Sequence, residues 1–341
     1  MPKSMTSRVK TTLLALGASV LPLLGAVGAS NAADLKHVTV VLSYIPNVEN
    51  FGTIYANAKG YFKDAGLEVE IVPGTSGIDG IQMISSGTAQ IAMVAAESVF
   101  SAEGRGEHLK VIGARFQMNP QAMTCRQDSG VTDAHMVKGK RLAIKQTATK
   151  QADVFLSKLG MTTKDMETLS VGGSDISAII AGRVDCLYST FAFNEPRLIE
   201  GAGVPVNVLP LGDYGLNSQP GAITVTEKYL NENKDVLTAF LTAESKAWAE
   251  FFKDPAAAAK FMVEGGFNDG LDLEQQVYQA GRQVSFMTSE TTKEKGILYL
   301  EPKVWQETAA NSFAAKSTAT LIDPSEFLTT EILDKVERPK L

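Results

Sequence analysis

Cysteine and histidine are scarce in this chain of 341 residues, which has two cysteines and three histidines. A structural zinc site needs four closely spaced soft ligands, and the sequence has no such cluster. His37, His108 and His135 fall at the start of the expected mature chain or in charged and loop-like stretches, which favours surface histidines over catalytic ones. We therefore expect no metal and no cofactor. A Ser/His/Asp or Cys/His catalytic group could be assembled only from scattered residues.

Basic residues are also fewer than acidic ones. The chain has 32 Lys and Arg residues and 38 Asp and Glu residues, which gives a net charge of -6. A protein that binds nucleic acid presents a basic face to the phosphates, so nucleic acid is not an expected partner. The glycine patterns of Walker and dinucleotide-binding loops are missing, which removes support for nucleotide hydrolysis. The balance is that of an ordinary globular protein, 44% hydrophobic and 21% charged. The length suits two domains of about 150 residues.

Residues 1–33 begin with three basic residues and no acidic one, and continue as an uncharged stretch with an apolar centre. Glycine, alanine, serine and proline dilute that centre, whereas a membrane anchor needs about 20 strongly apolar residues. This order is typical of a secretory signal peptide, so we expect cleavage near Ala32 or Ala33. Loss of the three basic residues leaves 29 against 38 acidic ones, a net charge of -9, on a soluble, exported protein.

Strand-like and helix-like segments alternate in two successive units, in the rhythm of a mainly parallel α/β sheet. The first unit has expected strands at 37–43, 67–72, 90–95 and 109–116, with helices at 48–59, 78–86 and a short one opening at Glu97. The second has expected strands at 141–144, 167–171, 184–189 and 205–211, with helices at 148–159, 175–181 and 195–200. After Gly221 the spacing of apolar residues predicts a helical tail, over 229–252, 255–263, 273–283 and 302–316.

Polar residues follow the first two strands, at the carboxyl ends where an open parallel sheet binds its ligands. Tyr44 offers a flat ring with a hydroxyl, and Asn47 offers both a donor and an acceptor. The alternative is that Pro46 and Asn47 only start a helix. Thr75 and Ser76 precede the next helix, where they either present free backbone N–H groups to a polar ligand or form a simple N-cap.

Two carboxylates, Glu97 and Glu195, follow strands in the two units. They could form an acid–base pair, accept hydrogen bonds from a bound amine or amidine, or cap the helices that they begin. Phe191 and Phe193 lie beside Glu195 and belong either to the core or to the wall of a cleft. The residue types alone leave these alternatives open.

Several short motifs follow one another through the mature chain: Tyr44-Ile45-Pro46-Asn47, Tyr55-Ala56, Lys59-Gly60-Tyr61-Phe62, Gly66-Leu67-Glu68-Val69, Gly80-Ile81-Gln82, Ser86-Gly87, Ala95-Ala96-Glu97-Ser98, Gly139-Lys140, Gly182-Arg183-Val184-Asp185 and Phe193-Asn194-Glu195-Pro196. In order and spacing the chain resembles periplasmic solute-binding proteins of ABC importers. The group concerned includes sulfonate, nitrate and taurine binders and binders of thiamine-pyrimidine precursors. The resemblance covers essentially the whole mature chain and implies a periplasmic location.

The aromatic-x-Pro-Asn start is similar to the pyrimidine-precursor branch, in which Asp-Trp precedes x-Pro-Asn and the Trp stacks on the ligand ring. Here those positions are Ser43 and Tyr44, so the resemblance implies stacking by Tyr44 and the loss of one carboxylate. The branch also has a Tyr four residues before a ligand-binding Glu, and here the pair is Phe191 and Glu195. The resemblance thus implies an aromatic heterocycle between Tyr44 and Phe191, with Glu195 accepting from a ring amine. Further candidate contacts are Asn47, Thr75, Ser76, Glu97 and Asn194.

The fold that the resemblance implies is α/β: a two-lobed periplasmic binding protein of type II, each lobe a mainly parallel sheet flanked by helices. Lobe one would comprise residues 34–118 with 222–341, and lobe two residues 119–221. The two crossings would fall near residues 117–120 and 219–223.

Cys125 and Cys186 fall in strand-like segments, and in an exported protein they could be bonded or be buried free thiols. Only neighbouring strands would let their sulfur atoms meet. In the fold that the resemblance implies, the crossover strand 122–126 lies beside the strand 184–189. The resemblance therefore allows a disulfide between Cys125 and Cys186 without requiring it.

The expected function is that of a non-catalytic carrier, a monomer whose lobes close by hinge motion on a small-molecule ligand and which docks on an ABC permease at the inner membrane. One alternative is the same carrier for an aliphatic sulfonate, taurine or nitrate, which needs a cationic or N–H-rich cleft; the candidates are Thr75, Ser76, Arg126 and Lys145. The other is an enzyme: a eukaryotic relative of the fold makes the thiamine pyrimidine with pyridoxal phosphate and a Cys-rich motif. This chain has no Cys cluster and no His in its candidate cleft segments, so an enzyme is not expected.

Overall fold

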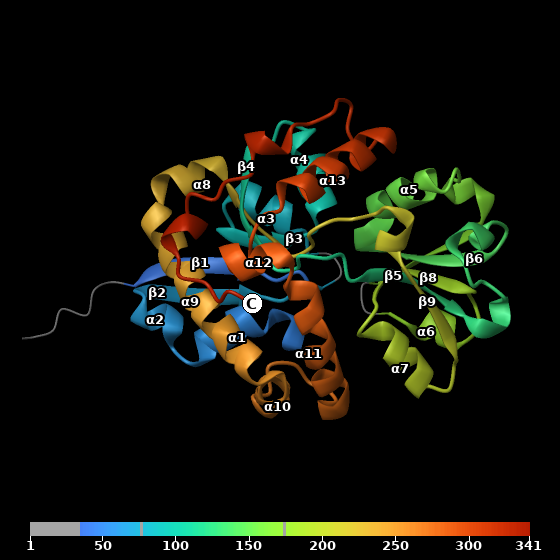
Figure 1. The fold of residues 1–341 in the computed structure, drawn as a ribbon, viewed down its shortest axis with the longest axis horizontal. Helices are drawn as coiled ribbons and strands as arrows, with labels where there is room; N and C mark the ends of the chain where they lie inside the picture. Colours follow the sequence, from blue (N-terminus) through green and yellow to red (C-terminus); the bar gives the residue numbers. More distant parts are fainter. Residues whose placement is uncertain (1–34, 76–77, 173–174) are drawn as a thin grey trace, which may run out of the picture. The chain divides into compact units, whose positions relative to one another are not determined.

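Two five-stranded sheets organise residues 35–75, 78–172 and 175–341, the part of the chain that this computed structural model describes. Figure 1 shows the four N-terminal strands of the first sheet in blue to teal and the strands of the second sheet in teal-green to yellow-green. The expected signal peptide, residues 1–33, and the candidate contact Ser76 lie outside the described residues.

The first sheet has the order β2-β1-β3-β10-β4, with β1 Lys36–Val41, β2 Leu67–Val72, β3 Ile91–Val94, β4 Leu109–Ala114 and β10 Ala222–Thr226. The strands β2, β1 and β3 are parallel, and β10 runs antiparallel between β3 and β4. In β2, Leu67 and Val69 are buried while Glu68 and Glu70 are exposed, as the alternation of the sequence predicts for a half-buried strand.

The second sheet has the order β7-β6-β8-β5-β9, with β5 Gln121–Arg126, β6 Arg141–Lys145, β7 Glu167–Val171, β8 Cys186–Phe191 and β9 Val206–Pro210. Here β5 is the antiparallel strand, and it lies between β8 and β9. The strands β7, β6 and β8 are parallel, so their carboxyl ends meet at one edge of the sheet.

Helices follow the strands in both parts of the chain: α1 Phe51–Ala58, α2 Tyr61–Asp64, α3 Gly80–Ser86, α4 Ala96–Glu103, α5 Thr149–Lys158, α6 Ser177–Ile180 and α7 Glu195–Gly201. The C-terminal part adds α8 Glu227–Glu232, α9 Lys234–Lys253, α10 Pro255–Glu264, α11 Leu273–Met287, α12 Glu290–Lys295 and α13 Pro302–Ala314. No helix of the described residues is both long enough and apolar enough to cross a bilayer.

Several elements differ from the sequence-based expectation, among them the helix α2 at Tyr61–Asp64, which was not expected. The composition after Gly221 predicted only helices, but residues 222–226 form the strand β10. This short, buried strand lies between β3 and β4 in the first sheet. The single helix expected over 229–252 is two helices, which meet at Asn233. The helix α12 was not expected; it begins at a capping box formed by Ser289 and Thr292.

Two buried glutamines tie together the segments that connect the sheets. The side-chain amide of Gln219 donates to Oε1 of Gln117 at 3.2 Å, and both amides donate to the carbonyl of Tyr299. Oε1 of Gln219 in turn accepts from Nε1 of Trp305 at 2.9 Å. Buried amides whose hydrogen-bonding capacity is met in this way hold both connections against α13 at one place.

Cys125 and Cys186 face each other on the paired strands β5 and β8 and form a disulfide. Both residues are fully buried among the apolar side chains of the second sheet, with Phe155 and Tyr188 in the same core. The first sheet has its own core, in which Phe51, Trp248 and Phe251 contact one another.

Candidate functional site

A cavity of about 780 Å³ opens where strand ends from both sheets converge. The segments after β1, β2 and β3 contribute Tyr44, Thr75 and Glu97 to its wall, and the ends of β6 and β8 contribute Lys145 and Phe191. Because parallel strands end at the same edge of a sheet, residues far apart in the sequence meet here. The sequence-based search for a site at the strand ends therefore leads to one cavity.

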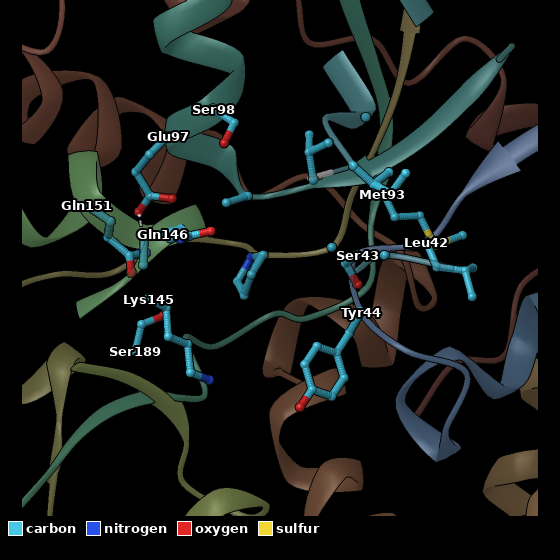
Figure 2. A pocket seen from close by; sticks show the side chains of 18 of the residues that line it. Leu42, Ser43, Tyr44, Met93, Glu97, Ser98, Lys145, Gln146, Gln151 and Ser189 are labelled. Carbon is cyan, nitrogen blue, oxygen red and sulfur yellow. Dashed lines mark hydrogen bonds between the residues drawn. The ribbon is translucent and has the colours of Figure 1, made fainter. Parts of the chain in front are cut away.

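Two aromatic rings line the cavity from the two sheets. Figure 2 shows the ring of Tyr44 projecting from the segment after β1. Phe191 is half-buried, and its ring meets those of Phe116 and Phe193 edge-on, with centroid distances of 5.6 and 5.5 Å. Edge-to-face packing of this kind fixes the Phe191 ring in place before any ligand arrives. Phe193, by contrast, is fully buried in the core of the first sheet.

Glu195 and Lys145 form a buried ion pair in the wall of the second sheet. Nζ of Lys145 contacts Oε1 of Glu195, and the side chains are 7% and 4% exposed. Oε2 of Glu195 accepts from the backbone N–H of Phe191 at 2.8 Å. Both oxygens of Glu195 therefore have partners within the protein, and a ring amine would have to share or displace one of them.

Glu97 is the first-turn carboxylate of α4 and reaches across to α5. Its Oε1 accepts from Nε2 of Gln151 at 3.1 Å, and its Oε2 is enclosed by protein atoms. Burial raises the pKa of Glu97, and the side chains of Gln151 and Ser218 oppose that effect only in part. Figure 2 shows the Glu97 carboxylate between Ser98 and Gln151.

A second buried carboxylate, Glu49, lies in the wall of the first sheet and was not singled out from the sequence. Its Oε1 accepts from Nη1 of Arg115 at 3.1 Å and from Oγ of Ser43 at 3.0 Å. Burial raises the pKa of Glu49, and the Arg115 guanidinium opposes this. The sequence shows Glu49 only as an acidic residue two positions after Asn47. Its partner Arg115 lies 66 residues further along the chain, so the sequence alone does not reveal the pair.

The remaining candidate contacts take different roles. Asn47 starts a short helical turn: it is 2% exposed, its Oδ1 accepts from the N–H of Glu49, and it does not line the cavity. Of the two interpretations of Asn47, the structure shows the helix start. Asn194 does line the cavity, but its Oδ1 accepts from Nε2 of Gln275 at 3.1 Å. Arg126, a candidate cation for a sulfonate, pairs with Asp128 and lies outside the cavity wall.

Comparison with known proteins identifies the family of the chain. The family model described as NMT1/THI5 like matches residues 47–258. The chain belongs to the NMT1/THI5-like family. A riboflavin-binding protein, RibY, of Chloroflexus aurantiacus is 27% identical, over 88% of this chain and 86% of that protein. A formylaminopyrimidine-binding protein of Halalkalibacterium halodurans is 25% identical, over 73% of this chain and 76% of that protein.

The family also contains enzymes. The Saccharomyces cerevisiae 4-amino-5-hydroxymethyl-2-methylpyrimidine phosphate synthase THI5 is 24% identical, over 71% of this chain and 75% of that protein.

Solved structures show the fold of this NMT1/THI5-like chain. The ligand-binding component of an ABC-type import system from Staphylococcus aureus superposes with a TM-score of 0.68 at 12% identity, covering 89% of this chain and 100% of that one. The alkanesulfonate-binding protein SsuA of Xanthomonas axonopodis gives 0.66 at 14% identity, with 87% and 99% covered. The periplasmic binding protein fold and the family resemblance expected from the sequence are thereby confirmed.

The buried charges in the wall of this NMT1/THI5-like cavity are paired with opposite charges, except for Glu97. Among the described residues at the cavity, the buried cations are Lys145, which pairs with Glu195, and Arg115, which lies behind the wall and pairs with Glu49. Glu97 has no cationic partner within 4.0 Å, and the remaining charged side chains of the wall, Asp79, Arg105 and Lys150, are exposed at its rim. Among the described residues, the buried wall therefore holds no cation that lacks a carboxylate partner. The described residues contain no cluster of three or more His, Cys, Asp or Glu placed to bind a metal.

Proposed function

We propose that this protein is the solute-binding component of an ABC importer and captures a small planar aromatic heterocycle, a thiamine-pyrimidine precursor or a similar ring. Residues 34–118 with 222–341 would form one lobe and residues 119–221 the other, the lobes closing on the ligand and presenting it to a permease. Support comes from the cavity at the strand ends of both sheets and from relatives named for binding riboflavin and a formylaminopyrimidine, both planar heterocycles.

The charge balance of the cavity wall carries the choice of ligand class. A sulfonate or nitrate needs a cation or several N–H donors that are free to bind it. Lys145 and Arg115 are each paired with a carboxylate, and Glu97 adds a buried carboxylate that has no cation within 4.0 Å among the described residues. An anion would be repelled by this carboxylate where it is ionised, whereas an uncharged ring would not.

An enzyme of the pyrimidine phosphate synthase type is the second candidate, because several such synthases are relatives of this chain. Pyridoxal phosphate is an anion and a Schiff-base former, so it needs an uncompensated lysine in the site. Lys145 lines the cavity but is held by Glu195, which argues for the carrier. Purified protein with no absorption band of the cofactor after incubation with pyridoxal phosphate would agree with this.

A thermal-shift panel on the mature chain tests the proposal. The compounds are 4-amino-5-hydroxymethyl-2-methylpyrimidine, nucleobases, lumichrome, taurine, ethanesulfonate, nitrate and pyridoxal phosphate. A ligand present at 100 times its dissociation constant adds about 2.7 kcal/mol, which raises the melting temperature by several degrees. A shift with a planar heterocycle supports the proposal. A shift confined to the sulfonates or nitrate would keep the carrier but reject the ligand class.

A further inference from the structure

More carboxylates than cations are buried at the cavity. Glu49, Glu97 and Glu195 line it and are buried, whereas the buried cations among the described residues are Lys145 in the wall and Arg115 behind it. The other charged side chains of the wall are exposed at its rim, where water and salt screen them. With every buried group ionised, the buried part of the site therefore carries negative charge in excess.

Arg115 is shared between two carboxylates, so it does not neutralise Glu49 alone. Its Nη1 donates to Oε1 of Glu49 at 3.1 Å. Burial lowers the pKa of Arg115, and the charges of Glu49 and of Glu244 on α9 both oppose this effect. Glu244 is 1% exposed and forms no ion pair within 4.0 Å among the described residues. A single guanidinium thus faces two buried carboxylates, which adds to the negative excess behind the wall.

One oxygen of Glu49 remains open to the cavity. Oε1 accepts from Arg115 and from Oγ of Ser43. Oε2 accepts no hydrogen bond from the described residues and is not fully enclosed by them, so it borders the cavity that Glu49 lines. Figure 2 shows Ser43 directly beside Tyr44, so the hydrogen bond from Ser43 holds this carboxylate on the side of the cavity that carries the Tyr44 ring.

The two aromatic rings of the cavity favour a ligand of the same charge. Tyr44 and Phe191 both line the cavity. The face of an aromatic ring is electronegative and attracts a cation that lies within about 6 Å of its centre. A planar ring that carries positive charge therefore gains this attraction in addition to stacking, whereas a neutral ring gains the stacking only.

We infer that the ligand of this site is a planar heterocyclic cation, such as a pyridinium, and that Glu49 is the residue that selects for its charge. This rests on the proposed function, since the ring would lie between Tyr44 and Phe191. The positive charge of the ligand offsets the excess of buried carboxylates. A neutral ring leaves that excess in place, and an anion adds to it.

The titration of Glu49 gives the inference a second signature. Burial raises the pKa of Glu49; the charges of Arg115 and Lys145 and the hydrogen bond from Ser43 oppose this, and the charge of Glu195 adds to it. A cation binds the ionised carboxylate, so its affinity should rise as the pH increases from about 4.5 through the raised pKa. A fixed cation does not itself titrate. Glu49→Gln should therefore remove most of the rise, since the other carboxylates are the same in both proteins.

Two matched pairs of compounds test the charge: nicotinamide with 1-methylnicotinamide, and quinoline with 1-methylquinolinium. The members of a pair differ by one methyl group and a fixed positive charge. All four are titrated into the mature, ligand-free chain by isothermal calorimetry at pH 7. We expect each cation to bind at least about tenfold more tightly than its neutral partner. In Glu49→Gln this ratio should fall toward one, whereas the control Glu290→Gln, at an exposed position on α12, should keep it.

The possible results separate this inference from the proposed function. A ratio near one in the unaltered chain, or binding of lumichrome together with no binding of either cation, overturns the inference and leaves the proposed function standing. A preference for the cations that Glu49→Gln leaves unchanged overturns the role of Glu49. Binding of no heterocycle overturns both. If Glu49→Gln fails to fold, as circular dichroism would show, the ratio and its pH dependence in the unaltered chain still decide.

Discussion

Lys145 and Glu195 form an ion pair inside the cavity wall, and the same carboxylate accepts the backbone N–H of Phe191. The pair thereby fixes the backbone beside one of the two rings that line the cavity, and it removes Lys145 as a free cation for an anionic ligand. A sequence that offers a lysine and a glutamate at two strand ends thus builds a wall with little net charge at this point.

Removing Lys145 should destabilise the protein, because it leaves the Glu195 carboxylate buried without its counter-charge. We expect Lys145→Met to lower the free energy of unfolding by about 3–5 kcal/mol, measured by urea denaturation. The double variant Lys145→Met with Glu195→Gln should recover part of the loss. Lys138→Met, which breaks a largely exposed pair with Asp165, is the control and should change stability little. A loss of under about 1 kcal/mol in Lys145→Met would contradict the buried-pair description.

Tyr44 should contribute to affinity through its ring rather than through its hydroxyl. Tyr44→Ala is expected to weaken binding of a heterocyclic ligand by about tenfold or more, since both the buried area and the stacking are lost. Tyr44→Phe should keep most of the affinity. Calorimetric titration of both variants with lumichrome checks this. Unchanged affinity in Tyr44→Ala would remove Tyr44 from the site.

The buried carboxyl of Glu97 should leave a trace in the pH dependence of stability. Burial raises its pKa above the ordinary value of 4.5, so the folded state holds this proton to higher pH than the unfolded state. The free energy of unfolding that Glu97 contributes should therefore fall as the pH rises from about 4.5 through the raised pKa. Urea midpoints of the unaltered chain and of Glu97→Gln are compared across this window. The unaltered chain should lose stability relative to the variant as the pH increases, and the opposite slope would refute the assignment.

The disulfide should stabilise the second sheet measurably. Cys125 and Cys186 close a loop over a sequence separation of 61, and both are fully buried. Replacing both by alanine should lower the free energy of unfolding by roughly 2–4 kcal/mol. A reductant should not change the unfolding curve of this variant. It should lower the stability of the unaltered chain, because unfolding exposes the buried disulfide to reduction. Identical unfolding curves for the two proteins without reductant would contradict the bond.

Local patterns predicted most of the fold, because most elements carry their own periodicity. The alternation over 67–72 and the run over 167–171 each became a strand with those bounds. The strand β10 was missed because five β-branched and small residues ahead of a helical region carry no local sign of a central position in a sheet.

In the candidate site, too, the sequence predicted local features but not contacts between distant residues. Tyr44, Thr75, Glu97, Phe191 and Glu195 were found because strand ends can be located from the sequence. Pairings over long separations could not be found this way: Glu97 with Gln151 over 54 residues, Glu49 with Arg115 over 66, and Lys145 with Glu195 over 50. Those pairings show that the carboxylates of Glu49, Glu97 and Glu195 each already have a hydrogen-bond partner within the protein.

The most direct test of the proposed ligand class is a calorimetric comparison on the mature chain, unfolded and refolded beforehand so that it starts without ligand. A planar heterocycle, lumichrome or 4-amino-5-hydroxymethyl-2-methylpyrimidine, and a sulfonate, ethanesulfonate or taurine, are each titrated at the same protein concentration. We expect saturable binding of a heterocycle, one molecule per chain, and no heat of binding from the sulfonates. Saturable binding of a sulfonate together with no response to any heterocycle would contradict the proposal.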